Sequence, residues 1–208
     1  IIPICVFGNY SAGKSTFINS LIGHEILPSG GDPVTAKIYK ISMSDTDDFA
    51  RIRFKHWEDE VELLYEGKTF RIRKGNQEDE MLVELAHLME ECVKDNMFGL
   101  INKALEFING YEKKDMDSIE ISDVIEVEVP FVKEGVLGRS RNNFVIFDTP
   151  GSNSNSNTDH SKVLADALHG FSNGIPVWIS QYESIDSNDN AKLCDDCLLY
   201  TSDAADEL

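Results

Sequence analysis

The sequence predicts a three-layer α/β domain with a mostly parallel sheet and an inserted strand and helix region. Three consecutive segments at the start support this class. Residues 1–7 are an almost unbroken apolar run, as expected for a parallel strand buried on both faces. A glycine-containing loop follows, and residues 14–22 then carry apolar side chains at helical spacing. Gly23 is placed to end that helix in a left-handed turn.

The insertion is expected at residues 45–130. Residues 49–57 and 70–73 alternate apolar and charged side chains, which predicts an antiparallel meander with a turn at residues 67–68. His56 belongs to this alternation, and we interpret it as an ordinary strand residue rather than a ligand.

Helical periodicity dominates residues 78–108, with a break expected at residues 96–99 and an end at Gly110. The simplest interpretation of the apolar stripe is core packing against the sheet. Docking of a partner helix is the alternative.

Further strands are expected at residues 34–41, 119–131 and 144–147. A helix is predicted at residues 161–171, and residues 175–179 are expected to form a buried strand.

Composition restricts the function. The 208 residues include 41% hydrophobic ones, enough for one substantial core, and no apolar run is long enough for a membrane-spanning helix. The 37 acidic residues outnumber the 19 basic ones, which disfavours nucleic acid as a partner because its phosphates would be repelled.

Cysteine usage favours a reducing compartment, since the four cysteines lack the density of a disulfide scaffold. Cys194 and Cys197 form a C-x-x-C pair, for which a redox or half-zinc site is the alternative. However, residues 197–207 resemble translated read-through of a transposase adapter used in sequencing libraries. We therefore expect residues 197–208 to be a non-native tail and give them no function.

Residues 8–15 read Gly-Asn-Tyr-Ser-Ala-Gly-Lys-Ser and match the phosphate-binding loop (P-loop) pattern. The loop lies between a strand and a helix N-terminus, where backbone N–H groups favour an anion. Gly8 and Gly13 stand where a side chain would obstruct the turn or the phosphates. Lys14 would bridge the terminal phosphates, and Ser15 would place its hydroxyl on Mg²⁺. A purely structural glycine turn is the alternative.

Asp148-Thr-Pro-Gly151 follows a predicted strand and forms a second motif. The Asp148 carboxylate can hold Mg²⁺ through water, and the Gly151 N–H can meet a γ-phosphate. Between the motifs, Thr35 could coordinate Mg²⁺ through its hydroxyl, with plain turn chemistry as the alternative.

Taken together, residues 8–19, 27–36 and 148–151 resemble the GTPase domain of the dynamin superfamily, in its bacterial dynamin-like branch. The likeness covers nearly all of residues 1–196, including the long separation between the two motifs. It implies a partial P-loop GTPase domain whose C-terminal strands are missing.

The resemblance also implies GTP binding, Mg²⁺-dependent hydrolysis to GDP and phosphate, and homodimerisation across the nucleotide. It implies membrane remodelling by a cytoplasmic protein peripheral to the membrane, with membrane contact through regions outside this chain. The implied catalytic residues are Lys14, Thr35, Ser11 and Gly151, with Ser15, Thr35 and Asp148 as metal ligands. The implied nucleotide contacts are Gly8, Asn9, Tyr10, Ser11, Ala12, Gly13, Lys14, Ser15, Thr16, Asp148 and Gly151.

Two positions depart from related enzymes. Tyr10 stands where animal dynamins carry a Gln implicated in hydrolysis, and Ser152 where Ras-type enzymes place a water-orienting Gln. No Asn/Thr-Lys-x-Asp motif follows Asp148, so guanine specificity rests on the resemblance alone. A nucleotide-gated binding switch with little turnover and a P-loop ATPase or kinase are the alternatives.

Overall fold

The computed structural model describes residues 1–8, 11–28, 37–56, 58–111, 124–140, 143–148 and 174–181. The elements in these ranges are eight strands and three helices. In chain order they are β1 (Ile2–Gly8), α1 (Lys14–Ile22), β2 (Ile38–Met43), β3 (Arg51–His56), β4 (Asp59–Glu66), β5 (Thr69–Lys74), α2 (Glu80–Glu91), α3 (Met97–Gly110), β6 (Val124–Val129), β7 (Phe144–Asp148) and β8 (Ile175–Ile179).

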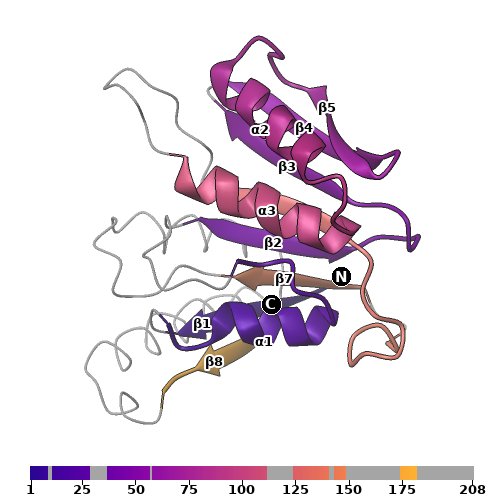
Figure 1. Cartoon of the computed structure of the whole chain (residues 1–208). Helices are drawn as coiled ribbons and strands as arrows, with labels where there is room; N and C mark the ends of the chain where they lie inside the picture. Colours follow the sequence, from indigo (N-terminus) through magenta and orange to yellow (C-terminus); the bar gives the residue numbers. More distant parts are fainter. Residues whose placement is uncertain are drawn as a thin grey trace.

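All the strands of these ranges belong to one sheet, in the order β5-β4-β3-β6-β2-β7-β1-β8 (Figure 1). Three pairings are parallel, namely β1 with β7, β1 with β8 and β2 with β6. The other four, β2 with β7, β3 with β4, β3 with β6 and β4 with β5, are antiparallel. The prediction of a mostly parallel sheet was therefore wrong. The antiparallel pairing of β2 with β7 and the inserted meander, which extends the same sheet through β3 and β6, make the sheet mixed.

The main core lies on the face that α1, α2 and α3 cover (Figure 1). Ile18 of α1, Leu85 of α2 and Leu100 of α3 are fully buried in one cluster with Val6 and Ile52 of the sheet. A smaller cluster forms on the opposite face of the central strands, from Cys5, Phe7, Ile38, Val145 and Phe147. The central strands are thus buried on both faces, as the apolar run at residues 1–7 predicts. The helix expected at residues 161–171 lies outside the described residues, so the third layer stays a prediction.

Charged side chains occupy the other face of the inserted strands. Glu126 of β6 pairs with Lys40 on one neighbouring strand at 2.8 Å and with Arg53 on the other at 2.5 Å. Arg51 contacts Glu128 in the same way at 2.5 Å. These pairs connect β6 to β2 and to β3, where the predicted insertion meets the strands outside it. They leave a polar surface there, as the alternating sequence predicts.

Two helices fill the region where one interrupted helix was expected. The break lies before Asn96 rather than at residues 96–99, because the Asn96 side chain accepts a hydrogen bond from the Gly99 N–H at 2.9 Å and begins α3. Asp79 caps α2 in the same manner, and its other carboxylate oxygen lies 3.1 Å from His56 Nε2. His56 is accordingly a buried residue of β3, held against the start of α2.

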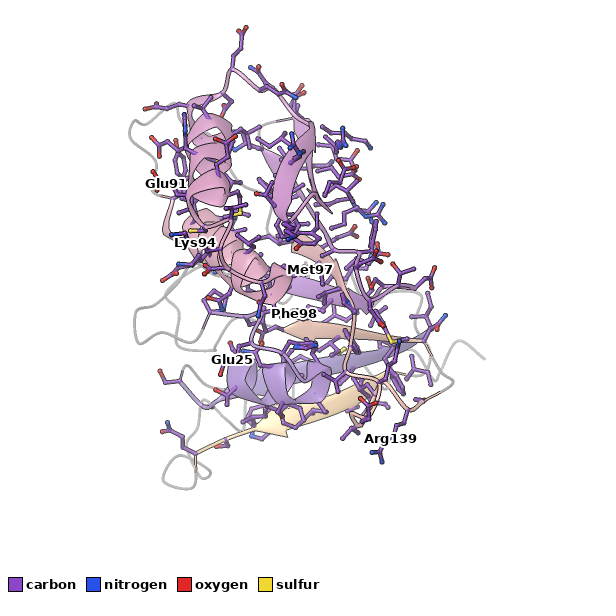
Figure 2. The ribbon with its side chains drawn as sticks, turned by 45° about the vertical axis from the view of Figure 1, so that its right-hand side comes forward. Glu25, Glu91, Lys94, Met97, Phe98 and Arg139 are labelled. Carbon is purple, nitrogen blue, oxygen red and sulfur yellow. The ribbon has the colours of Figure 1, made fainter. Side chains whose placement is uncertain are left out.

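The start of α3 also contacts the loop after α1. Figure 2 labels Met97 and Phe98 there, together with Glu91 at the end of α2 and Lys94 in the connection that follows. The Phe98 ring stacks on His24 with 3.4 Å between ring centroids. This contact ties the inserted helices to the segment that leaves the predicted P-loop helix.

β8 is the strand expected at residues 175–179, but it is less buried than predicted. In the described part of the chain it pairs only with β1 and forms the edge of the sheet. Ile175 is 44% exposed there. A continuous apolar run does not by itself distinguish a central strand from an edge strand.

Gly23 offers a test of how α1 ends. Its φ is 87° and its N–H donates to Asn19 O at 2.8 Å, while an added Cβ would lie 2.5 Å from a methyl group of Val132. We expect Gly23→Ala to lower the free energy of unfolding by about 1–3 kcal/mol, through backbone strain and overpacking. Urea unfolding monitored by circular dichroism measures this.

Gly110→Ala is the matched control, because among the described residues no atom beyond its own helix and its sequence neighbours lies within 4 Å of the added Cβ. Its free energy of unfolding should stay within about 1 kcal/mol of the parent, or rise. Equal losses in the two variants would contradict the packing of Gly23 on Val132.

Candidate functional site

The candidate site lies where three neighbouring strands end. β7, β1 and β8 are parallel, so their carboxyl ends meet at one edge of the sheet, from which the loop after β1 leads into α1 (Figure 1). Ligands of α/β proteins commonly bind at this edge. Of the predicted site residues, Asn9, Tyr10, Thr35 and Gly151 lie outside the described residues.

Two glycines shape the loop for different reasons. An added Cβ on Gly8 would lie 2.0 Å from the carbonyl oxygen of Ile179, so the backbone of β8 passes directly against the start of the loop. Gly13 has a φ of 95°, and in the described part of the chain no atom beyond its sequence neighbours lies within 4 Å of its added Cβ. Gly8 is therefore required by crowding, and Gly13 by its left-handed backbone.

The N-terminus of α1 retains its partial positive charge. Gly13 is its N-cap residue and supplies no side-chain hydrogen bond, and the first turn contains no acidic residue. Ser11 and Thr16 are exposed, while Ala12 and Ser15 are partly exposed. A helix end of this kind attracts an anion through its backbone N–H groups and its dipole.

Lys14 and Asp148 bring opposite charges together beneath the loop. Asp148 ends β7 in register with Val6 of β1, and Lys14 Nζ donates to the Gly8 carbonyl oxygen at 3.0 Å. Burial raises the pKa of Asp148 to about 7, although the Lys14 ammonium and a hydrogen bond from Ser15 oppose that rise. Burial also lowers the pKa of Lys14, against the attraction of Asp148.

The oxygen atoms here suit a hard divalent cation. Asp148 Oδ1 is buried and has no hydrogen-bond partner among the described residues. The Ser15 hydroxyl contacts the same carboxylate. Carboxylate and hydroxyl oxygens are ligands that Mg²⁺ accepts, and a cation would compensate the buried charge. The described residues therefore fit Mg²⁺.

Asn19 has a role that the sequence did not reveal. It is buried in α1, where its Oδ1 accepts from the N–H groups of Ile26 and Leu27, and its Nδ2 donates to the Leu27 carbonyl oxygen at 3.0 Å. The side chain thus fixes the backbone just before the segment that contains Thr35. The available signal was an amide on the apolar side of a predicted helix.

Two further polar residues near the site were also missed. Gln181 follows β8, and its Nε2 donates to the Ser11 carbonyl oxygen at 3.0 Å. Tyr39 of β2 is buried in cross-strand register with Asp148. Burial raises the pKa of Tyr39, whereas the nearby Asn109 side chain of α3 opposes this. No local sequence pattern indicates either contact.

No helix among the described residues has the length and apolar character needed to span a membrane.

Comparison with known proteins identifies the family. Residues 4–196 match the model of the dynamin family. Dynamin-like protein A of Bacillus subtilis (strain 168) is 29% identical in an alignment of length 199 that covers 82% of this chain and 17% of that protein. The chain thus spans about a sixth of the length of this curated relative.

Two solved chains, described as an oligomerised bacterial dynamin pair that senses and tethers membranes over long range, are also similar. They share 17% and 13% identity, with TM-scores of 0.43 and 0.35, and cover 92% and 95% of this chain but 23% and 28% of their own lengths. Scores this low add nothing to the assignment. The assignment rests on the family match, which spans most of the chain, and on this ground the chain belongs to the dynamin family.

Proposed function

We propose that this domain binds GTP with Mg²⁺ in the loop between β1 and α1 and hydrolyses it to GDP and phosphate. GTP binding and membrane-related roles are properties of the dynamin family, to which the chain belongs. The observation that carries the proposal is the buried Asp148 beside the half-buried Lys14, at an uncapped helix N-terminus. This arrangement places one fixed cation and a row of backbone N–H groups where a polyphosphate can meet both.

The loop residues would bind the nucleotide through its phosphates. The N–H groups of residues 11–16 would cradle the phosphate oxygens, and Lys14 would exchange its contact with the Gly8 carbonyl for the terminal phosphates. Asn9 and Tyr10 complete the loop in sequence and are proposed as further contacts.

Ser15, Asp148 and Thr35 are the proposed Mg²⁺ ligands, with Asp148 acting through water. The ion would neutralise charge on the phosphate oxygens. In this arrangement Asp148 would remain ionised, because a nearby divalent cation favours the carboxylate.

Hydrolysis would proceed by in-line attack of water on the terminal phosphate. We propose that Thr35 positions the water, that Gly151 donates its N–H to the γ-phosphate, and that Ser11 faces the β-phosphate or a charge-compensating cation. Donors fixed by the fold before the reaction stabilise developing charge without having to reorganise.

A nucleotide-gated switch with little turnover is the second candidate. Tyr10 and Ser152 occupy positions where related enzymes carry a Gln that acts on water, which favours slow hydrolysis. In this case the loops around Thr35 and Gly151 would change partners with the bound nucleotide.

The chain covers 17% of the length of its curated relative, so the activity of the whole protein is a proposal as well. We propose that GTPase domains pair across the nucleotide. We further propose that hydrolysis drives membrane remodelling at the periphery of the membrane, through regions outside this chain.

Replacing Lys14 tests the phosphate site. We expect Lys14→Ala in the full-length protein to weaken Mg²⁺–GTP binding about 100-fold, because a charge-assisted contact to phosphate is lost. Fluorescence titration with a mant-labelled GTP measures the affinity. Lys103→Ala removes an exposed ion pair with Asp95 on α3 and should leave affinity unchanged. Unchanged binding by Lys14→Ala would end the proposal.

Turnover distinguishes an enzyme from a switch. If GTPase domains activate each other by pairing, phosphate release should rise faster than linearly with protein concentration. A slow rate strictly proportional to concentration would favour the switch. Competition between GTP and ATP for the same site tests the base, and equal affinity for the two would favour an ATPase.

The ionisation of Asp148 links the candidate site to the free energy of unfolding. Its pKa is raised from 3.8 to about 7 in the folded protein, so the folded state holds this proton more tightly than the unfolded chain does. Stability is then lost as pH rises from about 4 to about 7 and stays low above that range, with an upper limit of about 4 kcal/mol.

Asp148→Asn should therefore raise the free energy of unfolding of the nucleotide-free protein more at pH 8 than at pH 4.5, while weakening the Mg²⁺ dependence of GTP binding. Urea unfolding at both pH values, with and without Mg²⁺–GTP, provides the measurement. A stability difference that does not change with pH would show that Asp148 ionises normally.

A further inference from the structure

The end of β8 contacts the P-loop at two points. The backbone of β8 lies against Gly8, where the carbonyl oxygen of Ile179 leaves no space for a side chain. Two residues later, Gln181 reaches over the loop and donates its Nε2–H to the Ser11 carbonyl oxygen at 3.0 Å. The two partners of this bond are 170 residues apart in the sequence. Both contacts come from a strand that contributes no residue to the phosphate-binding motif.

Ser11 needs such support because of its backbone conformation. Its φ is 56°, in the left-handed region that costs a residue other than glycine about 1–2 kcal/mol. In this turn the peptide carbonyl must point away from the phosphate position if the neighbouring N–H groups are to face it. A donor outside the loop that binds this carbonyl favours that orientation.

The opposite end of the loop is held in an equivalent way. Lys14 Nζ donates to the carbonyl oxygen of Gly8 at 3.0 Å, as Gln181 does to that of Ser11. Two side-chain donors therefore hold carbonyl groups of this loop. Lys14 would leave its carbonyl to bind phosphate, whereas Gln181 would keep its bond to the Ser11 carbonyl.

We propose that Gln181 is a positioning residue that holds the Ser11 peptide in the orientation needed to bind the nucleotide phosphates. This inference rests on the proposed function and deepens it. Gln181 would act through Ser11 without touching the nucleotide. Because its side chain is exposed and water competes for the bond, we expect a moderate effect on affinity, about three- to tenfold.

Gln181→Met tests the inference in the full-length protein, since methionine has a similar length but cannot donate. The affinities for mant-GDP and mant-GTP with Mg²⁺ should fall by the same three- to tenfold factor, because both nucleotides carry the β-phosphate. Gln181→Glu should weaken binding further, since its carboxylate would face the Ser11 carbonyl. The additional loss should persist at high salt, where general repulsion between charges is screened.

Ser20→Ala is the matched control. Ser20 on α1 also makes an exposed side-chain bond to a backbone carbonyl, with Phe17 as its partner at 2.8 Å, and it lies outside the loop. Its nucleotide affinity should equal that of the parent protein. Without nucleotide, all these variants should unfold at similar temperatures. A purely structural role of Gln181 would instead lower the unfolding temperature of the Gln181 variants.

Parent-like affinity in both Gln181 variants would overturn the inference. If Lys14→Ala abolishes binding in the same assay, the proposed function survives that failure. If the parent protein itself binds neither nucleotide, the proposed function fails and this inference fails with it.

Discussion

A carboxylate buried beneath the start of α1 is the constraint on which the rest of the site depends. Asp148 is buried at the end of β7, which lies between β1 and β2. Burial alone makes its charged form costly, and Lys14 and Ser15 offset only part of that cost. The fold thus maintains an incompletely compensated negative charge next to a region that attracts anions. An Mg²⁺–nucleotide complex would supply a cation for the carboxylate and an anion for the start of α1.

The sequence predicted local structure well and strand directions poorly. The expected bounds of α1 are the observed ones, because an apolar stripe, a preceding glycine loop and Gly23 are all local signals. The directions of the strands depend on which strands become neighbours. β2 runs antiparallel to β7 and parallel to β6. β3 is joined to β6 by the ion pairs of Arg51 and Arg53. Alternation shows that such a strand has one polar face, but not which strand it will pair with.

The residues of the candidate site also fall into two groups, those predicted from the sequence and those missed. Lys14, Ser15 and Asp148 were predicted because a phosphate-binding loop has a fixed spacing and because a motif at a strand end has a defined position. Asn19 and Gln181 were not, since each acts through the backbone of a distant or irregular segment, and a side chain that binds a carbonyl leaves no pattern in the sequence. Such supporting contacts become visible only when the strands that bring them together are in place.

The insertion is joined to the site by more than a shared sheet. Tyr39 pairs across the strands with Asp148, and its side chain lies near that of Asn109, close to the end of α3. At the other end of α3, Phe98 stacks on His24, which follows α1 (Figure 2). One inserted helix therefore contacts both the strand beside the buried carboxylate and the segment leaving the P-loop helix. Since α3 is packed at both ends, a displacement at either contact must be absorbed by the other or by the core between them. The insertion therefore packs against the proposed nucleotide site and is not a separate unit.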